Sequence, residues 1–245
     1  MIMSEYKTEK VMEKKKKKSR KKKTGTQKKK RIRLYLRAGL LVLVIALIVL
    51  ILIKIFRPSW LTNEYFEKTG QEIEAVEPEI DVELLTVNPY SRPGTPTEKI
   101  TGIVVHYTAN PGSDAIDNRN YFESLKDGHD TQVSSNFVVG LKGEIVQCVP
   151  TWEVAYASNS RNIDTVSIEC CHPDETGKFN DDTYRSMVQL CAWLCMKFEL
   201  TEENVIRHYD VTEKICPKYF VEDEEAWKNF REDIKNTLAK FKKNG

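Results

Sequence analysis

Three side chains of this chain have the chemistry of a zinc site: His106, His208 and Cys216. His106 follows an apolar run, and the other two lie in the segment RHYDVTEKICP, residues 207–217. Imidazole and thiolate are ligands that suit zinc. Three protein ligands leave one coordination position open, and this is found in catalytic zinc sites more often than in structural ones. We therefore expect the chain to supply the other groups of a zinc hydrolase.

Amide hydrolysis at zinc needs two more groups, because zinc itself lowers the pKa of a bound water to about 7 and polarises a carbonyl. A carboxylate must move the proton of the water to the leaving amine, and a cation must stabilise the oxyanion. Glu169 ends a predicted strand on the face opposite Val166 and Ile168, so its carboxylate can face a cleft. Lys214 lies two residues before Cys216. By spacing alone, Glu169 and Lys214 would more often be two ordinary surface charges.

Hydrophobic patterns predict the elements that position these residues. Short apolar runs rich in β-branched residues predict strands at 101–107, 133–139, 144–149, 165–170 and 205–207. Apolar residues at spacings of three and four predict helices at 114–125, 183–200 and 224–241. The glycines in 140–143 indicate a hairpin between the second and third strands. The pattern predicts an α/β domain with a central mixed sheet flanked by helices.

The N-terminal part of the chain has a different composition. Residues 1–37 contain 17 Lys and Arg against 3 Asp and Glu, whereas the remaining residues contain 21 against 33. Residues 34–56 are largely apolar, and as a helix they would span about 34 Å, enough for a hydrocarbon core of about 30 Å. No small-residue cleavage site follows, which favours an uncleaved transmembrane anchor over a signal peptide. The preceding cations predict a cytoplasmic N-terminus and an outer domain.

We therefore expect four zones along the chain. They are a basic, disordered cytoplasmic tail at 1–33, a transmembrane signal-anchor helix at 34–56, a linker at 57–99 and the zinc-binding domain at 100–245. Lysine blocks can bind nucleic-acid phosphates without specificity. Beside a membrane span they more often set topology and contact anionic lipid heads, so we expect membrane lipids and no specific nucleic acid as partners.

The chain has six cysteines, all after the expected membrane span. Cys216 is assigned to the metal. Cys191 and Cys195 lie four residues apart on one apolar helix stripe, which predicts core packing. The sequence does not define connectivity, and a disulfide between a strand cysteine and a helix cysteine stays an open alternative.

Five segments together resemble the type 2 family of N-acetylmuramoyl-L-alanine amidases, which includes phage lysis amidases and animal peptidoglycan recognition proteins. The segments are VVHYT (104–108), SNFVVG (135–140), GEIVQCVP (143–150), TVSIE (165–169) and HYDVTEKICP (208–217). The resemblance implies one zinc ion on His106, His208 and Cys216. By position it makes Glu169 the catalytic acid and Lys214 the support of the oxyanion.

The resemblance also implies a substrate and a location. The bond cleaved would join the lactyl group of N-acetylmuramic acid to L-alanine in peptidoglycan. The implied fold is a mixed sheet flanked by helices, with zinc at one edge. With the anchor, the protein would be a single-pass protein of a bacterial cell membrane, with its catalytic domain outside.

The chain departs from the family pattern in two places. Some members have a Tyr-His pair where this chain has Ser135 and Asn136, and many have a histidine near Ala157. A tyrosine-assisted mechanism is therefore not expected, and one substrate contact is in doubt. We expect substrate contacts from Asn136, Tyr156, Asn159 and His172, each of which could instead have a structural or surface role.

Two other functions compete with the enzyme. Several recognition proteins are non-catalytic binders that lack the metal cysteine, so a tethered peptidoglycan sensor is the main alternative. The presence of Cys216, Glu169 and Lys214 favours the enzyme. A structural zinc site would need a fourth protein ligand, for which His172 is the histidine expected nearby.

Overall fold

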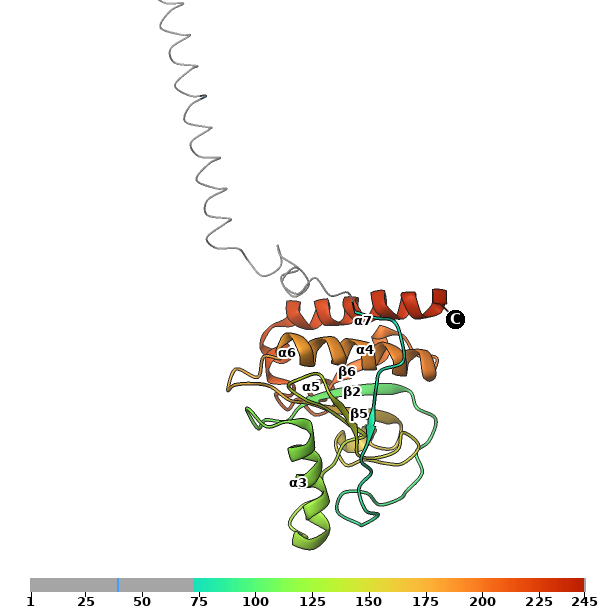
Figure 1. Ribbon diagram of the computed structural model, residues 1–245, viewed down its shortest axis with the longest axis vertical. Coiled ribbons are helices and arrows are strands. Elements are labelled where there is room, and N and C mark those ends of the chain that lie inside the picture. The colour runs from blue at the N-terminus through green and yellow to red at the C-terminus, as the bar shows by residue number, and fades with distance from the viewer. Residues whose placement is uncertain (1–38, 40–72, 245) are drawn as a thin grey trace, which may run out of the picture. The chain divides into compact units, whose positions relative to one another are not determined.

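The computed structural model describes residue 39 and residues 73–244 (Figure 1). The expected tail at 1–33, the expected membrane span apart from Gly39, and the first part of the expected linker lie outside the described residues. The described residues 73–244 belong to one compact unit. Within the described part, no helix combines the length and the apolar character needed to cross a bilayer.

A mixed sheet of six strands forms the centre of the domain, as the sequence predicted. Neighbouring strands are parallel except for the antiparallel β3–β4 pair, which is the expected hairpin. In the order β1-β4-β3-β5-β2-β6, the strands are Asp81–Val82, Ile145–Gln147, Phe137–Val139, Thr165–Cys170, Gly102–Tyr107 and Val205–Arg207.

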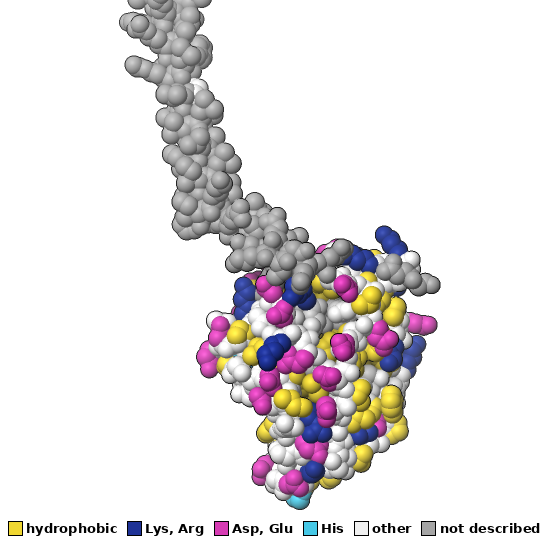
Figure 2. Space-filling model, in the orientation of Figure 1, with side chains coloured by type: hydrophobic (Ala, Val, Ile, Leu, Met, Phe, Trp, Pro, Cys, Tyr) yellow, Lys and Arg dark blue, Asp and Glu magenta, His cyan; other side chains and the backbone are white. Residues whose placement is uncertain are grey.

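Helices cover both faces of this sheet (Figure 1). One face carries α4 and α7, and the other carries α3. The helices are α3 (Ala115–Gly128), α4 (Asp181–Lys197), α5 (His208–Thr212), α6 (Lys218–Glu222) and α7 (Glu224–Asn244), with short 3-10 turns η2 (Asn159–Arg161) and η3 (Glu202–Asn204). On the face shown in Figure 2, the described acidic and basic side chains are interspersed rather than separated by sign.

The larger hydrophobic core lies between the sheet and the α4–α7 layer. Side chains alternate along a strand, so Ile103 and Val105 of β2 and Val166 and Ile168 of β5 enter this core. The opposing helices contribute mainly Met187, Leu190, Cys191, Leu194, Cys195, Trp227, Phe230 and Ile234. The strand residues that alternate with these core residues, including His106 and Glu169, therefore face the other side of the sheet.

A smaller core lies under α3, on the face that carries His106. It contains Phe122 of α3, Val138 of β3 and Val146 of β4. Leu85, from the expected linker, is buried in the same cluster at 1% exposure. Because β1 and Leu85 precede residue 100, the packed domain begins earlier than the composition suggested. Two-residue β1 is too short to show a strand pattern in the sequence.

All six cysteines are free and buried. Cys191 and Cys195 lie in the larger core, as the helix stripe predicted. The structure therefore contains no disulfide between a strand cysteine and a helix cysteine.

Candidate metal centre

His106, His208 and Cys216 converge at the carboxyl ends of two adjacent parallel strands. His106 is the fifth residue of β2, His208 directly follows β6, and β2 and β6 are paired. Cys216 follows α5 and comes back to the same point. The three ligating atoms lie within 4.8 Å of one another, and all three residues are buried. The predicted triad is therefore assembled by the fold.

The hydrogen bonds of the two histidines leave one ring nitrogen of each facing the centre. Nε2 of His106 lies 3.1 Å from the hydroxyl of Ser158, and Nε2 of His208 lies 3.0 Å from Oδ1 of Asn159. Nδ1 of His106 lies 3.8 Å from Sγ of Cys216, and the buried Nδ1 of His208 has no hydrogen-bond partner. Metal-binding histidines commonly donate their second N–H to an oxygen in this way. The donor set and the orphaned Nδ1 fit a zinc ion.

Burial favours the neutral forms of these ligands. It lowers the pKa of His106 well below its usual value, and the charges of His208 and Lys214 act in the same direction. Burial also lowers the pKa of His208, again with a contribution from Lys214. The pKa of Cys216 is raised to about 12, chiefly by burial and then by Glu169. Neutral imidazoles can bind metal directly, whereas the thiol must release its proton on binding.

Glu169 lies beside the triad on the neighbouring strand. It pairs in register with His106 across β2 and β5, so both side chains project from the same face. Its Oε2 is buried without a hydrogen-bond partner. Burial raises the pKa of Glu169 to about 8, although the charge of Lys214 lowers it. A carboxyl group with a pKa near neutrality can both accept and donate a proton.

Lys214 is an exposed residue of the segment that joins the two C-terminal ligands. Its positive charge lowers the pKa of His106, His208, Glu169 and Cys216. The segment turns back at Glu213, which has a positive φ of 62°. Lys214 therefore lies on the loop that joins two members of the triad, and its charge acts on the pKa of the predicted acid, Glu169.

Two of the four expected substrate contacts have other partners in the structure. The amide of Asn136 is buried, donates to the carbonyl of Pro150 at 3.0 Å and accepts from the backbone N–H of Ser167 at 2.9 Å. This supports the structural alternative for Asn136. Asn159 contacts His208, so it is placed to orient this candidate metal ligand.

The other two differ in accessibility. Tyr156 is half-buried, and its backbone pairs with Ser134. His172 is 1% exposed, although an exposed loop position was the main alternative. Its Nδ1 lies 2.8 Å from the carbonyl of Asp174, and its ring packs against Tyr107. His172 does not join the metal-ligating group found among the described residues.

Unsatisfied polar atoms gather at this end of the sheet. In the described part of the chain, four buried side-chain atoms lack a hydrogen-bond partner: Thr108 Oγ1, Glu169 Oε2, His172 Nε2 and His208 Nδ1. Each belongs to a residue at, or within two positions of, the carboxyl end of β2, β5 or β6. Buried groups of this kind cost stability, and in native proteins they often mark functional sites.

Ser158 was not predicted as a site residue, but it is fully buried and contacts His106. Serine has no distinctive pattern at such a position, and the preceding loop had no periodicity. Its position next to Asn159 could have indicated its role, since two adjacent residues of a short turn can each contact one of the two histidines.

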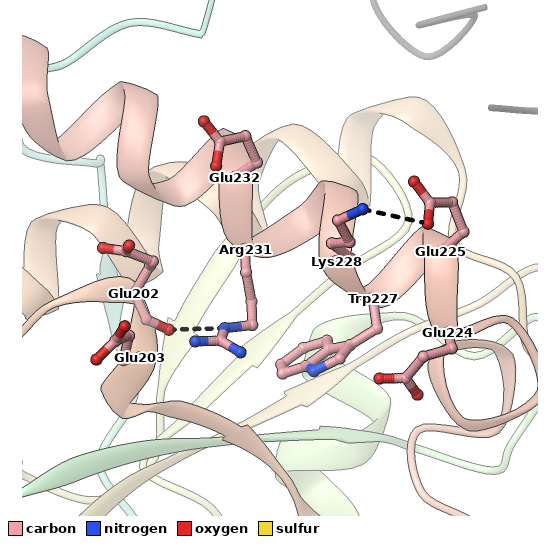
Figure 3. A pocket seen from close by; sticks show the side chains of 8 residues that line it. All are labelled: Glu202, Glu203, Glu224, Glu225, Trp227, Lys228, Arg231 and Glu232. Atoms are coloured by element: carbon pink, nitrogen blue, oxygen red, sulfur yellow. Dashed lines mark hydrogen bonds and ion pairs between the residues drawn. The ribbon is translucent and has the colours of Figure 1, made fainter. Parts of the chain in front are cut away.

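A separate cavity of about 390 Å³ lies between η3 and the first part of α7 (Figure 3). Its lining contains Trp227 and seven charged side chains, and none of the metal-centre residues. Several of these charges are already engaged: Arg231 donates to the carbonyl of Glu202, and Lys228 pairs with Glu225. The cavity is therefore distinct from the metal centre.

Residues 96–219 match the model of the N-acetylmuramoyl-L-alanine amidase family. The chain belongs to this family. The matched amidase region includes His106, Glu169, His208, Lys214 and Cys216.

Relatives with amidase names support the assignment of the amidase region. The chain is 32% identical over 165 residues to N-acetylmuramoyl-L-alanine amidase CwlL of Bacillus licheniformis, and 30% identical over 176 residues to N-acetylmuramoyl-L-alanine amidase BlyA of Bacillus subtilis (strain 168). These matches cover 62% and 63% of this chain. In both cases the chain spans 46% of the relative's length.

The fold of the amidase region also matches solved structures. The catalytic domain of XlyA superposes with a TM-score of 0.55 at 25% identity, over 64% of this chain and 99% of that domain. The mixed sheet flanked by helices is therefore the fold shared with this amidase domain.

We expect Ser158→Ala to weaken zinc binding about 10- to 100-fold, because the oxygen that orients His106 is lost. Competition with a chromophoric chelator measures the affinity. Ser160→Ala is the matched control, since Ser160 is exposed and the structure records no contact between it and His106, His208 or Cys216. Unchanged affinity in Ser158→Ala would show that the Ser158–His106 contact does not support the metal.

Proposed function

We propose that this chain is a zinc-dependent hydrolase that cleaves the amide between the lactyl group of N-acetylmuramic acid and L-alanine in peptidoglycan. The observation that carries the proposal is the convergence of His106, His208 and Cys216 within 4.8 Å, beside Glu169. Membership of the amidase family supports the choice of bond. A fourth protein ligand is absent from the metal-ligating group of the described residues, which favours a catalytic site.

His106, His208 and Cys216 would hold the zinc ion. When bound, zinc supplies a Lewis acid for the amide carbonyl and lowers the pKa of water. Ser158 and Asn159 keep Nε2 of each histidine occupied, so that both Nδ1 atoms stay available.

Glu169 has the position and the chemistry of the general base. It takes a proton from the attacking water and then donates it to the nitrogen of the departing L-alanine. Its unpartnered Oε2 leaves this oxygen free for the transfer. Lys214 places a positive charge where negative charge develops on the carbonyl oxygen. The exposed position of Lys214 lets its long side chain reach a substrate at the mouth of the site.

We also propose that residues 34–56 anchor the protein in a bacterial cell membrane, with the basic residues 1–33 in the cytoplasm and the catalytic domain outside. Support comes from the apolar character of 34–56 and from the cations on its N-terminal side. In this arrangement the basic tail would contact anionic lipids, and the domain would act on the wall next to the membrane.

Digestion of defined peptidoglycan by the purified full-length protein tests the proposed reaction. Mass spectrometry should detect stem peptides with a free L-alanine N-terminus, and a chelator should abolish their release. Added zinc should restore it. Release that is insensitive to the chelator would contradict the role of zinc. Zinc-loaded protein that binds muropeptides without releasing peptides would favour the tethered sensor.

Two substitutions separate the proposed roles from metal binding. Lys214→Ala should lower turnover about 100- to 1,000-fold because one oxyanion stabiliser is lost. Glu169→Gln should remove most activity, since glutamine cannot carry the proton. Both variants should retain one zinc per chain, measured by elemental analysis.

Glu175→Gln is a matched control, because Glu175 is an exposed carboxylate on the loop after β5. Near-normal turnover in either test variant would remove that residue from the mechanism.

A further inference from the structure

The segment between the two C-terminal ligands has little apolar burial to hold it in place. Residues 209, 210 and 212–215 are exposed, and Val211 is only partly buried. Yet the segment must keep His208 and Cys216 close enough to share one ion. The backbone bond from the N–H of Tyr209 to the carbonyl of Cys216, at 2.9 Å, spans the two ends. Polar interactions must therefore define this geometry.

Arg207 makes the densest set of these interactions. Its side chain is 9% exposed. The guanidinium donates to Asp210 through Nε at 3.2 Å and Nη2 at 2.9 Å, and Nη1 donates to Glu224 at 2.7 Å and to the carbonyl of Phe220 at 2.9 Å. Asp210 also accepts from the backbone N–H of Arg207 at 2.8 Å.

These contacts join the parts of the chain before and after Cys216. Asp210 lies in α5, inside the ligand segment, whereas Phe220 lies in α6, four residues beyond Cys216. Glu224 and Trp227 lie in the first turns of α7, where Figure 3 shows them on the side of the separate cavity. The guanidinium also lies 5.3 Å from the centre of the Trp227 ring. A single buried side chain thus holds three elements around the two ligands.

We propose that Arg207 is a positioning residue that holds His208 and Cys216 at ligating distance before the metal binds. The role of the metal in this inference rests on the proposed function. A planar guanidinium can bind a carboxylate and a backbone carbonyl in different directions at once, whereas the ammonium of lysine is a compact point charge. Arg207→Lys therefore keeps the positive charge and removes the planar arrangement of hydrogen-bond donors.

The first test compares zinc affinity in the full-length wild type and in Arg207→Lys by chelator competition. We expect a loss of about 10- to 100-fold, the size typical when a group that supports a metal ligand is removed. Arg92→Lys is the matched control. Arg92 likewise binds a carboxylate, on Glu153, at 2.7 and 2.8 Å, together with the carbonyl of Leu85 at 2.8 Å. Its contacts involve none of the three ligands, so its zinc affinity should stay at the wild-type value.

The second test uses the metal-free protein and needs no enzymatic activity. Hydrogen exchange at the amide of Tyr209 reports the bond to Cys216, and we expect about 10- to 100-fold faster exchange in Arg207→Lys than in wild type. Exchange in β5 serves as the measure of global folding. If Arg207→Lys does not fold, Asp210→Asn, which weakens the contacts with Asp210 and leaves those with Glu224 and Phe220, should show the same changes to a smaller extent.

The outcomes separate the two proposals. Wild-type zinc affinity and unchanged Tyr209 exchange in a folded Arg207→Lys protein would overturn the positioning role. Equal losses of zinc affinity in Arg207→Lys and Arg92→Lys would also overturn it, because general destabilisation would then account for both. A wild-type protein that binds no zinc would contradict the proposed function, while the exchange experiment would still decide whether Arg207 organises the segment.

Discussion

The parallel pairing of β2 with β5 is the constraint on which the rest of the site depends. It places His106 directly opposite Glu169, with both side chains on the face away from α4 and α7. A slip of one residue would turn one of the two into the hydrophobic core. The apolar neighbours that fill that core, Val105 and Ile168 among them, oppose such a slip because they would have to leave it. The same packing that stabilises the domain therefore sets the distance between His106 and Glu169, the proposed metal ligand and the proposed proton carrier.

The site combines this rigid base with polar groups that the fold leaves incomplete. Ser158 and Asn159 occupy one nitrogen of each histidine, while Nδ1 of His208 and Oε2 of Glu169 remain buried without partners. Such atoms reduce stability unless a ligand satisfies them. Zinc and substrate are the ligands that our account assigns to them. The nearby Arg207 network has the opposite character, since its buried charge is matched by two carboxylates and a carbonyl.

Sequence patterns predicted the parts of this structure that depend on local chemistry. The strand that contains His106, the long α4 stripe and the segment from His208 to Cys216 all have strong signals, and the mixed sheet followed from them. The contact of Ser158 with His106 could not be predicted, and the sequence could not decide between a substrate contact and a structural role for Asn136, because each depends on a contact between segments distant in the chain. The burial of Leu85 was missed for the same reason: its partners lie on α3, β3 and β4.

X-ray absorption at the zinc edge of the purified, zinc-loaded protein tests the central claim most directly, because it reports the atoms bound to the metal. We expect one sulfur, two imidazole nitrogens and one further light atom around the zinc. In Cys216→Ser the sulfur contribution should disappear. A wild-type shell without sulfur, or one without imidazole, would contradict the assignment of His106, His208 and Cys216 as the ligands of a catalytic zinc.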